Sequence, residues 1–220
     1  MSSLALIGRD IRLASRGGGN TFLAVAFFAT IVTLVPLGIE PVAGLLHAVA
    51  GGIVMLCSAL AALLSLDNLF QADFEDGSLE LLVTGPLSLE SLAASKIAAH
   101  WFTTALPLLA ISPLAAIAMD LPGAGLVGVV LAVALATPAV SAVGAIGASL
   151  TLSAKRGGLI LPLIVLPLLA PVIIFGAGVV RSKLEGAENG AVLYLSAFSL
   201  AAVLLSPFAV AAGLRTNLSA

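Results

Sequence analysis

The feature that most constrains this chain is a series of long apolar stretches that contain no Asp, Glu, Lys or Arg. They run over Thr21–Ile39, Val42–Leu66, Ile97–Met119, Leu121–Ala154, Gly157–Val180 and Asn189–Leu214. A helix that rises about 1.5 Å per residue needs roughly 20 residues to cross the ~30 Å hydrocarbon core of a bilayer. Each stretch reaches about this length, and 60% of the 220 residues are hydrophobic. The sequence therefore predicts an all-α, polytopic membrane protein with six transmembrane helices.

We place the spans at residues 21–39, 42–66, 97–119, 124–152, 158–180 and 191–214, within a single transmembrane domain over residues 1–220. The fourth stretch is longer than one span needs, so we expect tilt or a break there. Eight prolines fall within the spans. The carbonyl groups that these prolines leave without a partner must be satisfied by neighbouring helices, which favours a packed bundle.

Basic residues are distributed unequally between the two sides that six spans define. Seven of the nine lie on the side of both chain ends: Arg9, Arg12, Arg16, Lys96, Lys155, Arg156 and Arg215. The positive-inside rule places that side, with both termini, in the cytoplasm. The first twenty residues alternate apolar residues with three arginines. This pattern is typical of an interfacial helix on anionic lipid, and the arginines suit simple topology anchors equally well.

Negative charge is concentrated in the expected cytoplasmic segment, residues 67–95. Four carboxylates lie close together at Asp73, Glu75, Asp76 and Glu80. Apolar residues recur at helical spacing up to about residue 75, so the second span is expected to continue as an amphipathic helix. Asp73 falls inside the apolar arc of that helix and does not fit the pattern.

A second, shorter helix is expected after Gly77. Ser78 or Asp76 suits its cap, and Leu79 and Leu82 share its apolar face. Isolated helices this short are marginal in water, so it needs a partner surface. That surface is its own bundle, the membrane or a separate cytoplasmic protein. The acidic charge favours the separate protein, because anionic lipid headgroups would repel it.

Five sequence blocks carry a family resemblance: LFQADFEDGSLELL, GPLSLESLAASKIAAHW, ALPLLAISPLAA, AKRGG and LSPFAVAAGLR. Together they resemble the haem-exporter permeases, designated B, of the cytochrome c maturation ABC transporters, within the ABC-2-type permease superfamily. The blocks are spread from the second span to Arg215. KIAAHW and AKRGG are specific, whereas the short proline motifs alone would be weak.

The resemblance implies a permease that a separate cytoplasmic ATPase moves through the segment after the second span. The coupling residues would be Asp73, Glu75, Asp76, Gly77, Leu79, Glu80 and Leu82. Among these, the carboxylates would contact the ATPase while the two leucines pack into its groove. Lys155 and Arg156 suit a second ATPase contact or a lipid anchor equally. The chain lacks a GxxxxGK[ST] phosphate loop, so we expect no enzymatic activity of its own and ATP on the partner.

The resemblance also implies partners and a location. Two copies of the chain would pair with two ATPases in the bacterial inner membrane, beside other cytochrome c maturation subunits, a periplasmic haem chaperone and membrane lipid. No nucleic acid partner is expected. Haem is the implied substrate and no bound cofactor is implied. Two roles stay open, namely haem export and the ATP-driven release of a haem-loaded chaperone. The absence of charge within the apolar stretches argues against ion-coupled transport.

The two histidines are candidate haem contacts because imidazole is a common ligand of haem iron. His47 and His100 are expected near opposite sides of the membrane, too far apart to bind one iron, and a packing role is preferred for both. His100 keeps a substrate-related alternative, since it lies beside Trp101 in the KIAAHW block. No metal site is expected.

Small residues recur every fourth position on the fourth span, at Ser141, Ala145 and Ser149. Such spacing lets two helices approach closely. The contact lies either within one chain, which is commoner, or between two copies.

Overall fold

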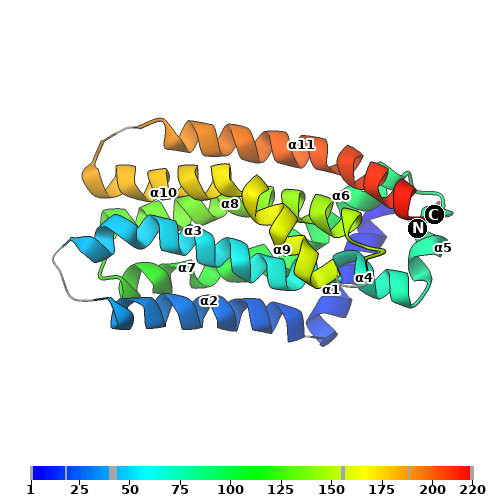
Figure 1. Ribbon diagram of the computed structural model, residues 1–220, viewed down its shortest axis with the longest axis horizontal. Coiled ribbons are helices and arrows are strands. Elements are labelled where there is room, and N and C mark those ends of the chain that lie inside the picture. The colour runs from blue at the N-terminus through cyan, green and yellow to red at the C-terminus, as the bar shows by residue number, and fades with distance from the viewer. Residues whose placement is uncertain (1, 18, 40–43, 155–156, 188, 219–220) are drawn as a thin grey trace.

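The computed structural model describes residues 2–17, 19–39, 44–154, 157–187 and 189–218. Over these residues the chain forms twelve helical segments and no strand, arranged as an elongated bundle (Figure 1). In chain order they are α1 (Ser3–Gly17), α2 (Gly19–Gly38), α3 (Leu45–Leu66), α4 (Asn68–Glu75), α5 (Ser78–Val83), α6 (Leu89–His100), the π-helix η1 (Trp101–Ala105), α7 (Leu106–Ala118), α8 (Gly123–Leu150), α9 (Gly157–Leu168), α10 (Ala170–Glu185) and α11 (Ala191–Leu218).

The bundle has the length and polarity of a multi-pass membrane protein, as predicted. Within the described residues, five continuous helical stretches are long and apolar enough to cross a bilayer: α2, α3 with α4, α6 through α7, α8, and α11. The α9–α10 pair makes a sixth span if its two bent halves are counted together.

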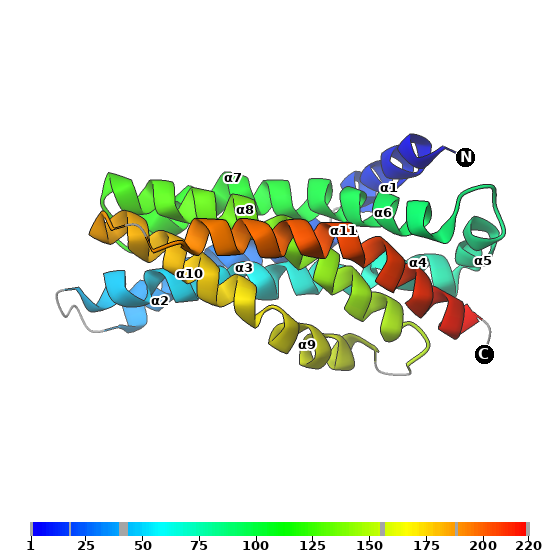
Figure 2. The ribbon, with the colours of Figure 1, turned by 90° about the horizontal axis from the view of Figure 1, so that it is seen from above.

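The bend lies in the fifth apolar stretch, whereas we expected tilt or a break in the fourth. Helix α8 continues through Pro138 without interruption. Helices α9 and α10 instead meet at 55°, and α9 leaves the bundle (Figure 2). Pro167 and Pro171 flank the junction at Leu169. Each proline lacks an N–H and clashes with the carbonyl group four residues earlier, so two of them in succession interrupt a helix that one proline only strains.

The third span contains a π-helical turn, η1. The N–H of Leu106 bonds to the carbonyl of Trp101, five residues earlier. Pro107 follows, and in a regular α-helix its ring would clash with the carbonyl of Thr103. The wider π turn relieves this contact. At its start, α6 is capped by Ser88, whose hydroxyl accepts the N–H of Ser91 at 3.2 Å.

Helix α8 lies at the centre of the bundle and is built from small residues. Ser141, Ala145 and Ser149 are all buried within the chain, and Gly144 lies directly against Leu66 of α3. This stripe therefore serves helix packing inside one chain, which is the commoner of its two predicted uses.

Both chain ends lie at the same end of the bundle, together with α4, α5 and the start of α6 (Figure 1). We call this the charged end. The α2–α3, α7–α8 and α10–α11 connections lie at the opposite end. The predicted N-terminal helix is present as α1. It packs against α6 with Leu6 fully buried, so its apolar face is covered by protein at that position.

Candidate functional site

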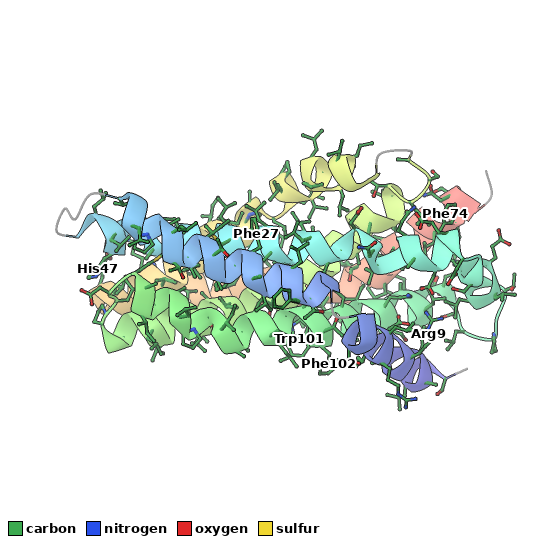
Figure 3. All side chains as sticks on the ribbon, turned by 90° about the horizontal axis from the view of Figure 1, so that it is seen from below. Arg9, Phe27, His47, Phe74, Trp101 and Phe102 are labelled. Carbon is green, nitrogen blue, oxygen red and sulfur yellow. The ribbon has the colours of Figure 1, made fainter. Side chains whose placement is uncertain are left out.

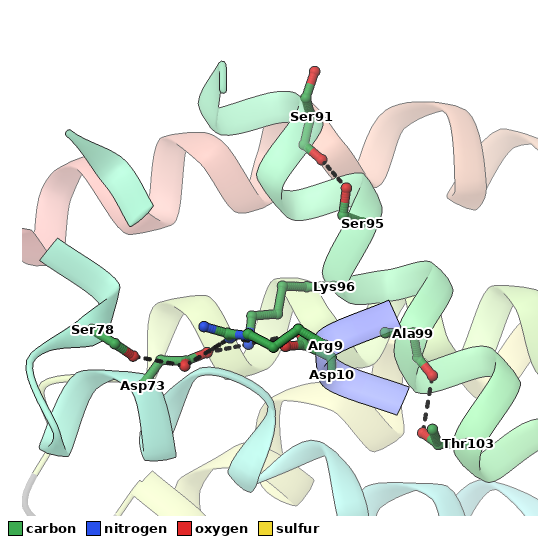
Figure 4. Close-up of polar contacts among 9 residues, drawn as sticks. All are labelled: Arg9, Asp10, Asp73, Ser78, Ser91, Ser95, Lys96, Ala99 and Thr103. Carbon is green, nitrogen blue, oxygen red and sulfur yellow. Dashed lines mark hydrogen bonds and ion pairs between the residues drawn. The ribbon is translucent and has the colours of Figure 1, made fainter. Parts of the chain in front are cut away.

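Asp73 is the centre of a buried group of charges at the charged end (Figure 4). Only 7% of its surface is exposed. Its carboxylate accepts hydrogen bonds from the Arg9 guanidinium at 2.9 and 3.1 Å and from the Ser78 hydroxyl at 2.8 Å. It also pairs with the ammonium group of Lys96. This one side chain on α4 therefore binds groups from α1, α5 and α6.

Asp10 completes what we call the charge cluster, namely Arg9, Asp10, Asp73 and Lys96. Its carboxylate lies 2.8 Å from Arg9 and 3.0 Å from the Lys96 ammonium. Lys96 is 4% exposed. Buried charges are tolerated when they are paired and hydrogen-bonded. The two cations and two carboxylates meet this requirement and sum to zero formal charge.

Two predicted coupling residues, Asp73 and Leu79, lie in the interior and not on a surface open to a partner. Leu79 is fully buried in the core of its own chain, and Leu82 is half-buried. The short helix thus packs one face on its own bundle, the alternative that the acidic charge had disfavoured. Asp73 turns inward with Phe70, one turn earlier on α4, because Arg9 and Lys96 neutralise it there. This explains its position in the apolar arc.

The remaining predicted carboxylates lie on the outside of the same helices. Glu75, Asp76 and Glu80 are exposed, and beside them Leu81 is 75% exposed. We call these four residues the acidic face. Leu81 was not among the predicted coupling residues. Its exposure is seen only in the structure, where Leu79 is buried and Leu82 is half-buried. These two short helices therefore expose negative charge together with apolar side chains.

The turn between α4 and α5 fixes the orientation of the acidic face. Gly77 has φ of 76°, in the left-handed region that glycine adopts at little cost. The N–H of Ser78 donates to Asp76 at 2.8 Å, so Asp76 supports the start of α5, as one predicted cap would. Its interaction with Ser78 holds the pKa of Asp76 below its ordinary value. Asp76 therefore stays ionised.

A cavity of about 310 Å³ lies beside the charge cluster, between α1, α4, the end of α3, and α6 with η1. The cluster lines one part of it. Another part is lined by neutral polar residues of the neighbouring helices: Ser65, His100, Thr103 and Thr104. The charges and this neutral polar layer thus share one space.

His100 is buried and bridges three helices. Its Nε2 lies 2.8 Å from the Ser65 hydroxyl on α3, and its Nδ1 lies 2.9 Å from the Ser141 hydroxyl on α8. Ser65 also lies 3.0 Å from the Thr104 hydroxyl. Both ring nitrogens are therefore engaged, as a packing histidine requires. The adjacent Trp101 donates its indole N–H to Thr137 at 3.3 Å. A substrate-related role for His100 and Trp101 stays a prediction.

The second histidine, His47, lies at the end opposite to Arg9 (Figure 3). Its Nε2 is 2.9 Å from the backbone oxygen of Asp120. Throughout the described part of the chain, no group of three or more His, Cys, Asp or Glu side chains is placed to hold a metal ion.

Lys155 and Arg156 lie outside the described residues. The start of α9 just after them approaches the junction of α3 and α4. A β-carbon on Gly158 would come within 2.8 Å of the Asp67 carboxylate. Gly158 at the start of α9 is therefore a neighbour of Asp67 between α3 and α4.

Sequence reasoning missed Arg9 and Asp10 as parts of the site. The residues around Arg9 indicated a helix on lipid or a topology anchor. The residues around Lys96 indicated only the start of the next span. The available signal was Asp73 itself, a carboxylate inside an apolar arc, since a buried acid requires a cation. Which cation it would meet could not be read, because Arg9 is 64 positions away in the sequence.

Known proteins of one family match nearly the whole length of this chain. The family described as CcmB protein matches residues 1–217. Heme exporter protein B of Paracoccus denitrificans is 49% identical over 215 residues, which cover 97% of this chain and 99% of that protein. Heme exporter protein B of Pseudomonas aeruginosa is 41% identical over 213 residues, 96% of each chain. That of Escherichia coli K12 is 38% identical over 210 residues, 95% of this chain and 96% of that protein.

Proposed function

The chain belongs to the CcmB protein family, whose curated members are named heme exporter protein B, and we propose that it is the membrane component of an ABC transporter that delivers haem to the periplasm for c-type cytochrome biogenesis. A separate ATPase hydrolyses ATP and moves this chain. The chain itself catalyses no reaction, and haem is its substrate.

The observation that carries the coupling proposal is the acidic face. Glu75, Asp76 and Glu80 are exposed, as is Leu81, on two short helices whose opposite faces are buried against the bundle. Exposed carboxylates together with an exposed apolar side chain suit a groove that has basic and apolar parts. Anionic lipid would repel the same surface. A basic ATPase groove is therefore its best partner.

Orientation and assembly follow from this assignment. The charged end faces the cytoplasm of a bacterium, and the opposite end faces the periplasm, in agreement with the excess of basic residues at the charged end. Two copies of the chain pair with two ATPases in the inner membrane. Other cytochrome c maturation subunits and a periplasmic haem chaperone complete the assembly.

A second role is favoured by the state of the histidines. Both ring nitrogens of His100 are hydrogen-bonded, and His47 lies at the far end of the bundle. His100 therefore offers no free ring nitrogen to iron, and the exposed His47, whose Nε2 contacts Asp120, lies at one end of the bundle only. In this alternative, the chain transmits the movement of the ATPase to release a haem-loaded periplasmic chaperone and does not pass haem itself.

The coupling assignment is tested by reversing charge on the acidic face. We expect Glu75→Lys with Asp76→Lys to reduce the amount of ATPase that co-purifies with the chain at least tenfold, which corresponds to about 1.4 kcal/mol. Glu185→Lys is the matched control, because it reverses an exposed carboxylate at the opposite end and should change co-purification less than about twofold. Membrane accumulation should stay equal in all variants. Normal co-purification and full cytochrome c maturation by the reversed chain would show that the assignment is wrong.

ATP hydrolysis separates the two roles. The complex is placed in nanodiscs and measured with free haem, with the haem-loaded chaperone, and with neither. Stimulation by free haem supports export through this chain, whereas stimulation only by the loaded chaperone supports its release.

A further inference from the structure

The charge cluster links the coupling helices to the third span through one carboxylate. Ser78, the first residue of α5, donates its hydroxyl to Asp73 on α4, and Asp73 pairs with Lys96 on α6. Helix α5 is short and its other inward anchor is Leu79. Charged and hydrogen-bonded groups thus connect α5 to Lys96 without interruption (Figure 4).

Lys96 stands one helical turn before His100. Positions four residues apart lie on the same face of a helix, and both side chains line the same cavity. His100 in turn bonds to Ser65 on α3 and Ser141 on α8. A rotation or shift of α6 at Lys96 thus reaches two further spans within one turn, about 5.4 Å along the helix.

The third span is irregular at this point. The π-helix η1 begins at Trp101, directly after His100. Short π segments interrupt regular helical bonding and often occur at functional positions. The part of the span that carries Lys96 and His100 is therefore separated from α7 by an irregular turn.

The cluster does not have the character of a ligand site. Its formal charge sums to zero, and among the described residues every buried side-chain nitrogen or oxygen has a hydrogen-bond partner. Stability alone is also a weak reason for such a cluster, because replacing buried ion pairs by apolar residues is often neutral or stabilising.

We propose that Asp73 and Lys96 form a positioning pair that transmits movement of α4 and α5 to the third span. This inference rests on the proposed function, in which an ATPase drives those helices. Asp73 then lies beneath the acidic face that binds the ATPase. The residues that bind the ATPase therefore differ from the residues that transmit its movement to the third span.

The test is a double-mutant cycle in the purified complex and in cells. Asp73→Asn and Lys96→Gln each break the pair, and the double variant breaks it without leaving an uncompensated charge in the cluster. We expect all three to lower cytochrome c maturation at least tenfold, with co-purification of the ATPase and its basal ATP hydrolysis within about twofold of the parent. The double variant should be no worse than the more impaired single one, since the contact between Asp73 and Lys96 is already lost in each single variant. Glu185→Gln, which breaks the exposed Arg181–Glu185 pair, is the control and should leave all readouts unchanged.

A purely structural role predicts a different pattern, in which co-purification and maturation fall together. That pattern would overturn the proposal, as would normal maturation by the double variant. If a single variant does not accumulate, the double variant carries the test, and its failure to accumulate would also overturn the proposal by making the pair a requirement for folding. If the parent chain itself does not bind an ATPase, the proposed function fails, and not only this inference.

Discussion

Two adjacent glycines on α3 should respond oppositely to the same substitution. A β-carbon on Gly51 would lie 2.9 Å from the carbonyl oxygen and 3.0 Å from the Cα of Ala177 on α10. These are backbone atoms, so no side-chain rotation makes room and the two helices must separate. A β-carbon on Gly52 meets nothing within 4 Å.

The expected change in stability of each variant follows from this difference in contacts. Replacing glycine by alanine inside a helix stabilises by roughly 0.5–1 kcal/mol, and this gain is common to both positions. Overpacking a close contact costs typically 1–3 kcal/mol. Gly51→Ala should therefore be about 1–3 kcal/mol less stable than Gly52→Ala. For a chain of this size, each kcal/mol shifts the melting temperature by roughly 2–4 °C.

The assay compares both variants with the parent in the same detergent. Aliquots are heated, and the fraction that remains monodisperse is measured by fluorescence-detected size-exclusion chromatography. We expect Gly52→Ala at or above the apparent melting temperature of the parent and Gly51→Ala roughly 2–12 °C below Gly52→Ala. Equal melting temperatures, or the reverse order, would refute the close approach of α3 and α10.

Three further predictions concern the charged end and the topology. Leu79→Ala should lower stability by about 2–5 kcal/mol because it empties a fully buried site, whereas Leu81→Ala should leave the melting temperature unchanged and weaken co-purification of the ATPase. Ser141→Ala should cost about 1–3 kcal/mol, measured as a lower melting temperature, because it leaves one nitrogen of His100 without its buried partner. In a chain whose buried native cysteine is replaced, Ala187→Cys should react with an impermeant thiol reagent in spheroplasts, while Leu81→Cys should react only after lysis. Labelling of both before lysis would contradict the assigned orientation.

The fold class was predictable because the bilayer imposes a simple rule on length and polarity. Continuous apolar runs of about 20 residues have few alternatives to spanning helices. The bend in the fifth stretch was not predicted, because length alone directed attention to the fourth stretch, whereas the two prolines beside Leu169 decided the outcome. Local proline spacing was visible in the sequence and carried the better signal.

The candidate site was only partly predictable. The sequence identified the acidic segment and its two helices, since caps, glycines and charges are local features. The sequence did not show which of these side chains point into the bundle and which are exposed. Asp73 and Glu75 are both acidic and two residues apart, yet one is buried and the other is exposed. The difference arises from Arg9 and Lys96, which reach Asp73 only in the folded chain.

The attachment of α1 to the charge cluster has a consequence for biogenesis. Arg9 is made early, but its partner Asp73 follows 64 residues later. At about 5–20 residues per second, that interval is roughly 3–13 seconds of synthesis. We expect α1 to lie on the membrane surface during this time, with its arginines against anionic headgroups. Lipid would then be the first partner of this helix and the charge cluster its final one, so a membrane poor in anionic lipid should slow the docking of α1 without changing the finished structure.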